Sequence, residues 1–178
     1  PRVPITAKLV ANLLETAGVT HVLTMDLHAG QLQGFFDIPL DNLSGRPPLV
    51  EALKKSIETD GLDFVVVAPD IGSTKLAEAY AHDLHANFAI VYKHRVSAKK
   101  TEAVAVIGDV KGKDVLLADD MCTTSATLLS AAKACQEKGA KTIWAVITHG
   151  VFVNESIEKI EKSPIDALLV TNTISIQD

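Results

Sequence analysis

Hydrophobic residues recur along the chain with two spacings that alternate from one end to the other. In some segments they return every four positions, as at Ile5, Leu9 and Leu13, which is typical of an amphipathic helix. In others they form short unbroken runs, which are typical of buried strands. The predicted helices are 4–17, 48–60, 74–84, 128–138 and 155–162, and the predicted strands are 21–25, 64–68, 88–92, 103–107, 115–118, 142–148 and 167–171. This alternation predicts the α/β class, with a parallel sheet covered by helices on both faces.

Composition narrows the classes of protein that fit. With 178 residues, 47% of them hydrophobic, the chain can form one domain, or one domain and part of another. The net charge of −5 and the 4% aromatic content argue against a nucleic-acid partner. No apolar run approaches the length of a membrane span, so no membrane partner is expected. Cys122 and Cys135 form no disulfide or metal-binding pattern, which predicts free thiols and a cytoplasmic location.

The segment 115–127 carries the densest set of candidate ligands. Its apolar strand runs into Asp119 and Asp120, whose carboxylates can accept hydrogen bonds from two neighbouring sugar hydroxyls. A helix follows, and its N-terminus favours an anion. Between strand and helix stand the hydroxyl residues Thr123, Thr124, Ser125 and Thr127. The arrangement suits a ribose that carries a 5-phosphate; the alternative is a core strand followed by a helix that these hydroxyls simply cap.

Two more acid-bearing turns follow predicted strands, and ligands bind at the carboxyl ends of parallel strands. Asp70 opens the turn 70–75, whose small residues and hydroxyls suit a diphosphate, although its spacing is not that of a P-loop and an ordinary turn is the alternative. Asp26 and His28 lie two residues apart, where one Mg²⁺ or one phosphate could contact both, although a lone His is usually structural or exposed.

A polar stretch begins at Lys93 and Arg95 and separates the predicted strands 88–92 and 103–107. Cations beside a phosphate site can neutralise charge that develops on a transferred group. A solvated hairpin loop is the alternative meaning of this stretch.

Several stretches together resemble the ribose-phosphate diphosphokinase (phosphoribosyl diphosphate synthetase) family. The sequence RVPITAKLVANLL at 2–14 and the sequence DLHAGQLQGFFDIP at 26–39 carry the resemblance, and the second resembles the signature of that family. The motif of 115–127 also resembles the ribose-phosphate loop that this family shares with type I phosphoribosyltransferases, and IGDVKGKD at 107–114 resembles the segment before it. The resemblance covers nearly the whole chain.

The resemblance implies a fold and a reaction. The expected fold is a parallel-sheet, type I phosphoribosyltransferase-like domain over 44–178, preceded at 1–43 by the last helix and strand of a second, similar domain, with a linker at 42–48. The expected reaction transfers diphosphate from ATP to C1 of ribose 5-phosphate, with Mg²⁺, and gives phosphoribosyl diphosphate and AMP. A homo-oligomer is expected for the full-length parent, of which this chain, beginning at Pro1, would be a fragment.

The resemblance also implies roles for single residues. Lys93 and Arg95 resemble the cations of a mobile catalytic loop, and Asp26, His28 and Asp70 resemble metal ligands, with Asp37 and Asp41 also matching the metal signature. The expected ligands of ribose 5-phosphate are Asp119, Asp120, Thr123, Thr124, Ser125, Ala126 and Thr127, and the expected diphosphate loop is Asp70, Ile71, Gly72 and Ser73.

The chain departs from the family pattern at four of these positions or beside them. Thr123 stands where a third Asp is usual, and Ala126 and Ser73 stand where Gly is usual. Leu76 replaces an Arg that is common in the diphosphate turn. Two alternatives therefore stay open: a regulatory subunit that resembles the synthetase, and a type I phosphoribosyltransferase that consumes its product.

Overall fold

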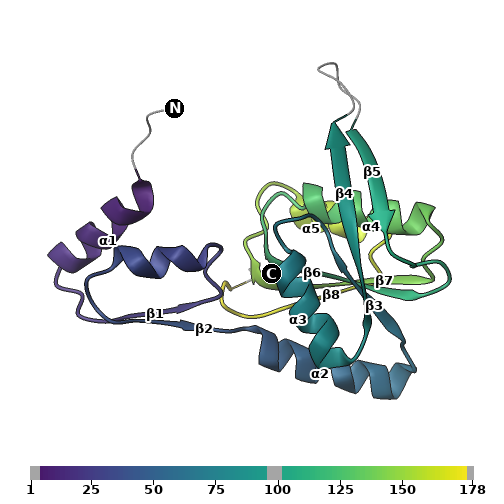
Figure 1. The fold of residues 1–178 in the computed structure, drawn as a ribbon, viewed down its shortest axis with the longest axis horizontal. Helices are drawn as coiled ribbons and strands as arrows, with labels where there is room; N and C mark the ends of the chain where they lie inside the picture. The colour runs from purple at the N-terminus through teal and green to yellow at the C-terminus, as the bar shows by residue number, and fades with distance from the viewer. Residues whose placement is uncertain (1–4, 96–101, 176–178) are drawn as a thin grey trace. The chain divides into compact units, whose positions relative to one another are not determined.

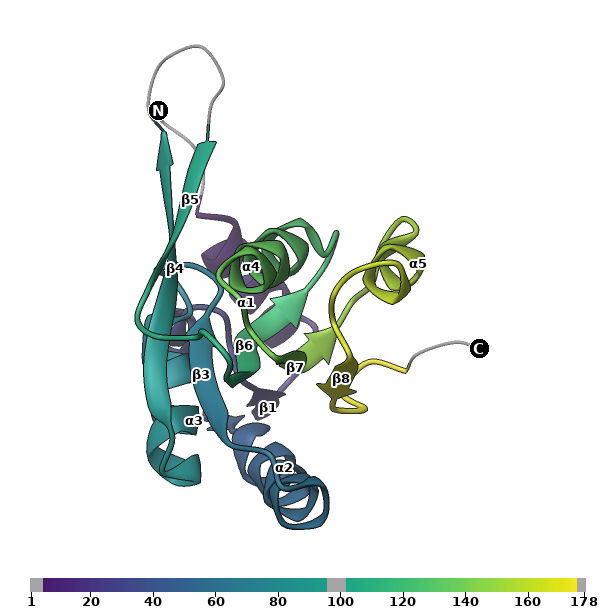
Figure 2. The same cartoon turned by 90° about the vertical axis from the view of Figure 1, so that its right-hand side faces the viewer.

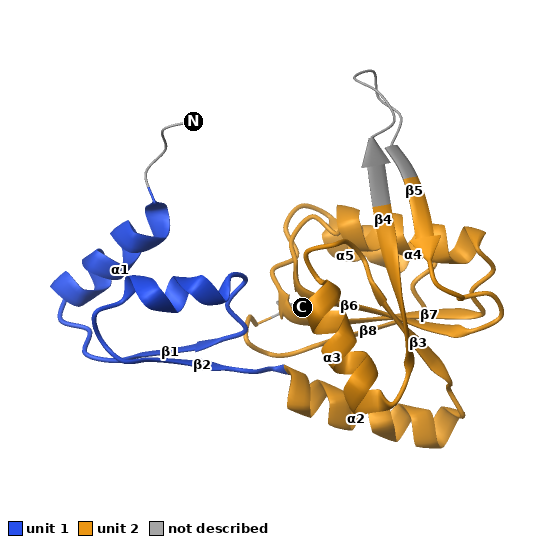
Figure 3. Cartoon of the chain, in the orientation of Figure 1, with its two compact units in different colours: residues 1–45 blue, residues 46–178 orange. Residues whose placement is uncertain are grey.

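The computed structural model describes residues 5–95 and 102–175, which form two compact units, residues 1–45 and 46–178 (Figure 3). Figure 1 shows the order of the elements along the chain. None of the helices in the described part is long and apolar enough to cross a membrane.

Unit 1 holds a helix and a small parallel sheet. Its elements are α1 (Thr6–Thr16), β1 (Val22–Met25), a 3-10 helix (Gly30–Phe35) and β2 (Leu40–Leu43). β1 and β2 pair in parallel, with Val22 opposite Leu40. The sequence analysis predicted α1 and β1 but missed β2, because the sequence Leu-Asp-Asn-Leu has too few apolar residues to stand out as a strand.

Unit 2 is built on a six-stranded sheet with the order β5-β4-β3-β6-β7-β8. The strands are β3 (Phe64–Ala68), β4 (Asn87–Arg95), β5 (Glu102–Ile107), β6 (Asp114–Cys122), β7 (Thr142–Gly150) and β8 (Ala167–Val170). All neighbours pair in parallel except β4 and β5, which form an antiparallel edge. The predicted parallel sheet is therefore confirmed over five strands, and β5 is the exception.

Helices cover both faces of this sheet (Figure 2). They are α2 (Arg46–Asp60), α3 (Thr74–Leu84), α4 (Ala126–Glu137) and α5 (Ser156–Glu161). Alternate residues of β3 serve the two faces: Val66 packs in one buried cluster with α2 and α3, and Val65 and Val67 pack in the other with α4 and α5. Because both faces are buried, the strands read as continuous apolar runs, which is why the sequence revealed them.

The helix α2 begins earlier than the sequence analysis expected, and the predicted linker 42–48 is not present as such. Residues 42–43 belong to β2, and Arg46 starts the helix. Pro47 and Pro48 occupy its first turn, where a missing N–H costs nothing because no carbonyl lies in position to accept it. The Arg46 guanidinium also pairs with Asp83 of α3 at 2.8 Å.

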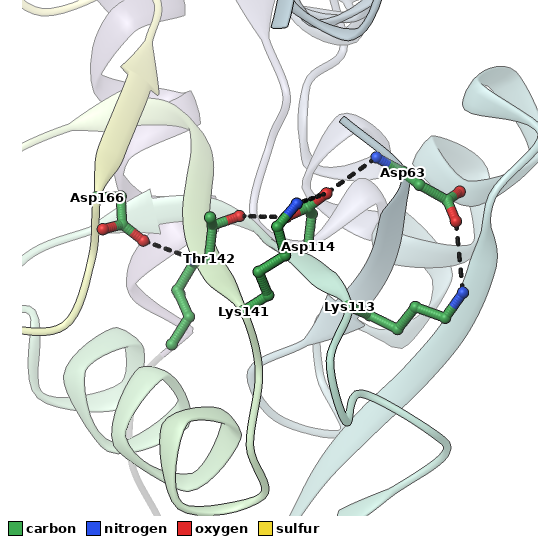
Figure 4. Close-up of polar contacts among 7 residues, drawn as sticks. Asp63, Lys113, Asp114, Lys141, Thr142 and Asp166 are labelled. Atoms are coloured by element: carbon green, nitrogen blue, oxygen red, sulfur yellow. Dashed lines mark hydrogen bonds and ion pairs between the residues drawn. The ribbon is translucent and has the colours of Figure 1, made fainter. Parts of the chain in front are cut away.

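A buried carboxylate joins three strands at the amino-terminal edge of the sheet (Figure 4). Asp114, only 3% exposed, accepts hydrogen bonds from the Asp63 N–H at 3.1 Å and the Thr142 hydroxyl at 2.9 Å, and it pairs with the Lys141 ammonium at 3.1 Å. Burial by itself raises the pKa of Asp114, but these partners outweigh burial and hold that pKa below its ordinary value. Asp114 thus ties together the starts of β3, β6 and β7, at the edge of the sheet opposite its carboxyl edge.

Candidate active site

The predicted ligands of unit 2 gather at the carboxyl edge of the sheet, between β3 and β6. These two strands are neighbours, and the chain continues outward from them in opposite directions, to β4 on one side and to β7 on the other. Such a point, where the strand order reverses, leaves a crevice outside the carboxyl ends of the strands in open α/β sheets. Asp70 follows β3, and Asp119 and Asp120 lie near the end of β6.

β6 is longer than predicted, and it includes both acids. The predicted strand ended at residue 118, but pairing with β7 continues from Asp119, opposite Ile147, to Cys122, opposite Gly150. The apolar run stops at Ala118 because the end of the strand is only partly buried, while its backbone ladder continues. The carboxylates are therefore held by a strand and not by a loop.

The carboxylates of Asp120 and Asp70 act electrostatically on that of Asp119 at this edge of the sheet. Burial, together with the charges of Asp120 and Asp70, raises the pKa of Asp119 to about 7. The Asp120 N–H donates to Asp119 Oδ1 at 3.0 Å, which acts in the opposite direction without cancelling the rise. Repelling negative charges in a partly buried position are costly to the fold, and groups so perturbed mark functional sites more often than chance.

Residues 123–125, where the sequence predicts an anion site, form a loop after β6 that we call the anion loop. The helix after it starts at Ala126 and not at Leu128. Thr123 and Thr124 are exposed, whereas Ser125 is buried and has a φ of +62°. Ser125 makes no side-chain capping bond to α4; its hydroxyl donates instead to the Thr124 carbonyl at 2.6 Å. The simple capping alternative therefore does not describe Ser125, and Ala126 and Thr127 lie in the first turn of the helix.

The turn after β3 is organised by Asp70. Its Oδ1 accepts bonds from the Ser73 N–H at 3.1 Å and from the Ser73 hydroxyl at 3.3 Å. A Cβ at Gly72 would lie 3.2 Å from the same oxygen, so a larger residue would crowd the carboxylate. Ser73 has a φ of −86°, which any residue adopts, so replacing the usual Gly strains nothing. Ile71 is 62% exposed at the tip of this turn.

The predicted metal ligands Asp26 and His28 lie in unit 1, and Asp70 lies in unit 2. Asp26 has a φ of +40°, and its Oδ2 accepts a bond from the Gly45 N–H at 3.0 Å; His28 is exposed. Residues 5–95 and 102–175 contain no group of three or more His, Cys, Asp or Glu side chains that could hold a metal by themselves. The ligand set therefore stays a prediction.

Two other acids of the metal signature have side-chain partners within unit 1. Asp37 pairs with the Lys8 ammonium at 3.1 Å, and Asp41 contacts the His21 ring at 2.8 Å. Both carboxylates are exposed, so these pairs are weak and would yield to a stronger ligand.

Lys93 and Arg95 belong to strand β4, although the sequence analysis placed them at the start of a loop. Their backbones pair with Val104 and Glu102 of β5. The antiparallel pairing of β4 with β5 continues past the apolar residues of β4 into its charged residues. The first charged residue therefore did not mark the end of the strand. The rest of the predicted catalytic loop, 96–101, lies outside the described residues.

One contact of the site gave no signal in the sequence. The Ser156 hydroxyl donates to the Thr123 carbonyl at 2.7 Å, across 33 positions of the chain. The sequence analysis treated this region only as the start of a short helix, and a single Ser at a helix start is too common to indicate a role.

The fold matches a known class of architecture. A purine phosphoribosyltransferase from Pyrococcus horikoshii has a similar fold, with a TM-score of 0.50 at 15% identity, over 86% of this chain and 89% of that one. At this identity the likeness shows the fold alone: unit 2 has the parallel-sheet architecture of type I phosphoribosyltransferases.

Closer likenesses specify the family. The phosphoribosyl synthetase-associated domain matches residues 91–178. Ribose-phosphate pyrophosphokinase 2 of Schizosaccharomyces pombe is 44% identical over 177 residues, which are 99% of this chain and 55% of that protein. The crystal structure of phosphoribosylpyrophosphate synthetase from Mycobacterium smegmatis has a TM-score of 0.92 at 36% identity, and it covers 100% of this chain and 57% of that one. The chain belongs to the ribose-phosphate pyrophosphokinase family, and it spans about half the length of the relatives it matches.

Proposed function

We propose that this chain carries the ribose 5-phosphate side of a ribose-phosphate diphosphokinase. The reaction moves the β,γ-diphosphate of ATP to the C1 hydroxyl of ribose 5-phosphate, and it gives phosphoribosyl diphosphate and AMP. The observation that carries this proposal is the likeness over 99% of the chain to a protein that bears the name of this activity. The partners that we propose are the substrates ribose 5-phosphate and ATP, and further copies of the same protein in a homo-oligomer.

The acceptor sugar would bind at the end of β6. Carboxylates accept two or more hydrogen bonds each, so Asp119 and Asp120 can together hold neighbouring ribose hydroxyls. The 5-phosphate would lie at the loop 123–125 and the first turn of α4, a helix of 12 residues whose N-terminal N–H groups and dipole favour an anion. A sugar held from both ends would present C1 toward the turn of Asp70, which follows the neighbouring strand β3.

The diphosphate donor would lie beside the turn 70–73 and the end of β4. Lys93 and Arg95 would neutralise the negative charge that develops on the transferred group. Asp70 fits Mg²⁺, since this ion prefers carboxylate oxygens and commonly takes only one or two from a protein, together with substrate phosphates and water. When bound, Mg²⁺ would spread the charge of the phosphate oxygens. Separately, we propose Asp26 and His28 of unit 1 as metal ligands.

The first experiment measures the binding of ribose 5-phosphate to this chain by calorimetry, with ribose as the matched ligand without phosphate. We expect binding of ribose 5-phosphate and much weaker binding of ribose. Formation of AMP from ATP, ribose 5-phosphate and Mg²⁺ is then followed, and we expect slow turnover by this chain alone. Failure to bind ribose 5-phosphate would refute the proposal. Transfer of phosphoribose to a base, without any use of ATP, would favour the phosphoribosyltransferase alternative instead.

A further inference from the structure

A strained segment lies behind the anion loop. We call residues 150–156 the supporting segment. Phe152, Asn154 and Glu155 have φ angles of +41°, +50° and +37°. Asn tolerates this left-handed conformation, but Phe and Glu adopt it rarely. Backbone strain of this kind persists only where surrounding contacts impose it, and it is concentrated at ligand sites.

The contacts that hold this segment go to the end of β6 and to the start of the anion loop. The N–H groups of Val151 and Phe152 both donate to the Cys122 carbonyl, each at 3.0 Å. The Val153 N–H donates to the Thr123 carbonyl at 3.0 Å. The Ser156 hydroxyl lies 2.7 Å from the same Thr123 carbonyl and also contacts the Val153 carbonyl, so its single hydrogen is shared between these two acceptors. Two consecutive carbonyls therefore each have two donors in the supporting segment.

These bonds orient the opposite side of the loop backbone. In a trans peptide the carbonyl of one residue and the N–H of the next point in opposite directions, and the described chain has no cis peptide bond. Since the Cys122 and Thr123 carbonyls face the supporting segment, the N–H groups of Thr123 and Thr124 point away from it. Two backbone donors are thus aligned at the exposed side of the loop, where an anion would bind.

Ser156 and Gly150 limit how far the supporting segment can relax. Ser156 is 1% exposed, and loss of its hydroxyl would leave the Thr123 carbonyl with one hydrogen-bond partner fewer. A Cβ at Gly150 would collide with the Phe152 ring, which shows that the ring packs directly against the backbone at this position. The segment is therefore held from both ends.

We propose that the supporting segment holds the loop 123–125 in its anion-binding conformation, and that Ser156 is a positioning residue that acts on phosphate affinity through the Thr123 carbonyl. This inference rests on the proposed function, because the anion is the 5-phosphate of ribose. A loop that is already ordered loses less conformational freedom when it binds its ligand, so it binds more tightly than a loose one.

The test compares Ser156→Ala with Ser163→Ala. Ser163 is a matched control, because its hydroxyl also donates to a backbone carbonyl, that of Ile160 at 2.6 Å, but lies past the other end of α5. Calorimetry measures the affinity of the chain for ribose 5-phosphate and for inorganic phosphate. Hydrogen exchange measures the protection of the amides 151–153. Ser156→Cys, which keeps the shape and a weak donor, serves as a second variant.

We expect Ser156→Ala to weaken ribose 5-phosphate binding about three- to tenfold, the factor that corresponds to one net hydrogen bond. Exchange at 151–153 should accelerate in the same variant, Ser156→Cys should lie between it and the wild type, and Ser163→Ala should stay within about twofold of wild type in both measurements. Unchanged affinity in Ser156→Ala, with or without faster exchange, would overturn the inference and leave the proposed function standing. A wild-type chain that does not bind ribose 5-phosphate would overturn both.

Discussion

Replacing Asp119 by Asn should stabilise the fold while it removes a ligand of the sugar. The structure places this carboxylate beside Asp120 and Asp70, and burial together with their charges raises its pKa from 3.8 to about 7. Asn keeps the size and a carbonyl oxygen but cannot ionise. Asp119→Asn therefore relieves the repulsion and deprives the ribose of a charged acceptor. Such a trade-off between stability and function is common at active sites.

The size of the effect follows from the shift in pKa. The pKa of Asp119 rises by roughly three, and each pKa unit corresponds to about 1.4 kcal/mol, so the gain in free energy of unfolding in Asp119→Asn is at most about 4 kcal/mol. Rearrangement of water and of neighbouring charges should reduce this gain to about 1–3 kcal/mol. Because the folded pKa lies above the unfolded value, ionisation costs stability. The cost is absent below pH 3.8, grows as the pH rises toward 7, and is constant above that.

Urea unfolding at several pH values measures the difference. Asp119→Asn should exceed the wild type in free energy of unfolding at pH 8, and the difference should fall to about 1 kcal/mol or less at pH 4.5. Asp60→Asn, at an exposed position at the end of α2, is the control, because an exposed side chain has no burial to relieve. Calorimetry should show loss of ribose 5-phosphate binding in Asp119→Asn alone. A stability difference that is equal at both pH values would refute the reasoning.

Three further predictions concern other parts of the chain. Asp114→Ala should lower the free energy of unfolding by about 2–4 kcal/mol at pH 7, because it leaves buried partners unpaired. Since the pKa of Asp114 is lower in the folded state, this loss should shrink as the pH falls below 3.8. Urea unfolding that shows no such trend would contradict the prediction. Lys93→Ala, in a protein with the full length of the relatives, should reduce kcat far more than substrate binding, whereas a regulatory subunit would have no turnover to lose. Burial raises the pKa of Cys135 to about 12 and also raises that of Cys122, so an aromatic disulfide reagent at pH 8 should label neither thiol until urea unfolds the chain; rapid labelling of the native chain would exclude this burial.

Elements with a full apolar signature were predicted almost to the residue. β3 (Phe64–Ala68) and α3 (Thr74–Leu84) have the bounds expected from the sequence, because both are packed in the core and their apolar residues report that packing directly. Elements that are held mainly by backbone pairing were missed or cut short. β2 was not found, and β6 and β4 continue past their apolar residues into charged ones.

The residues of the candidate site also fall into those that the sequence revealed and those that it did not. The sequence identified the acids, the hydroxyl residues and the small residues of both turns, because each is a chemical group that can be read from its side chain. It could not identify Ser156, whose contact to Thr123 depends on a carbonyl, and every residue has one. It also could not distinguish a Ser that caps α4 from a Ser that bonds to Thr124, because the choice depends on the φ of +62° at Ser125.

The sequence by itself determined the α/β class, the family resemblance and the list of groups that can touch a sugar phosphate, since these depend on side-chain chemistry and on local periodicity. Only the tertiary structure decided that Asp70 and Asp119 share one place, because β3 and β6 are separated by a hairpin in the sequence but are neighbours in the sheet. It also decided that the anion loop is held from behind by a strained segment about 30 residues further along the chain, since hydrogen bonds between distant backbones leave no pattern in a sequence.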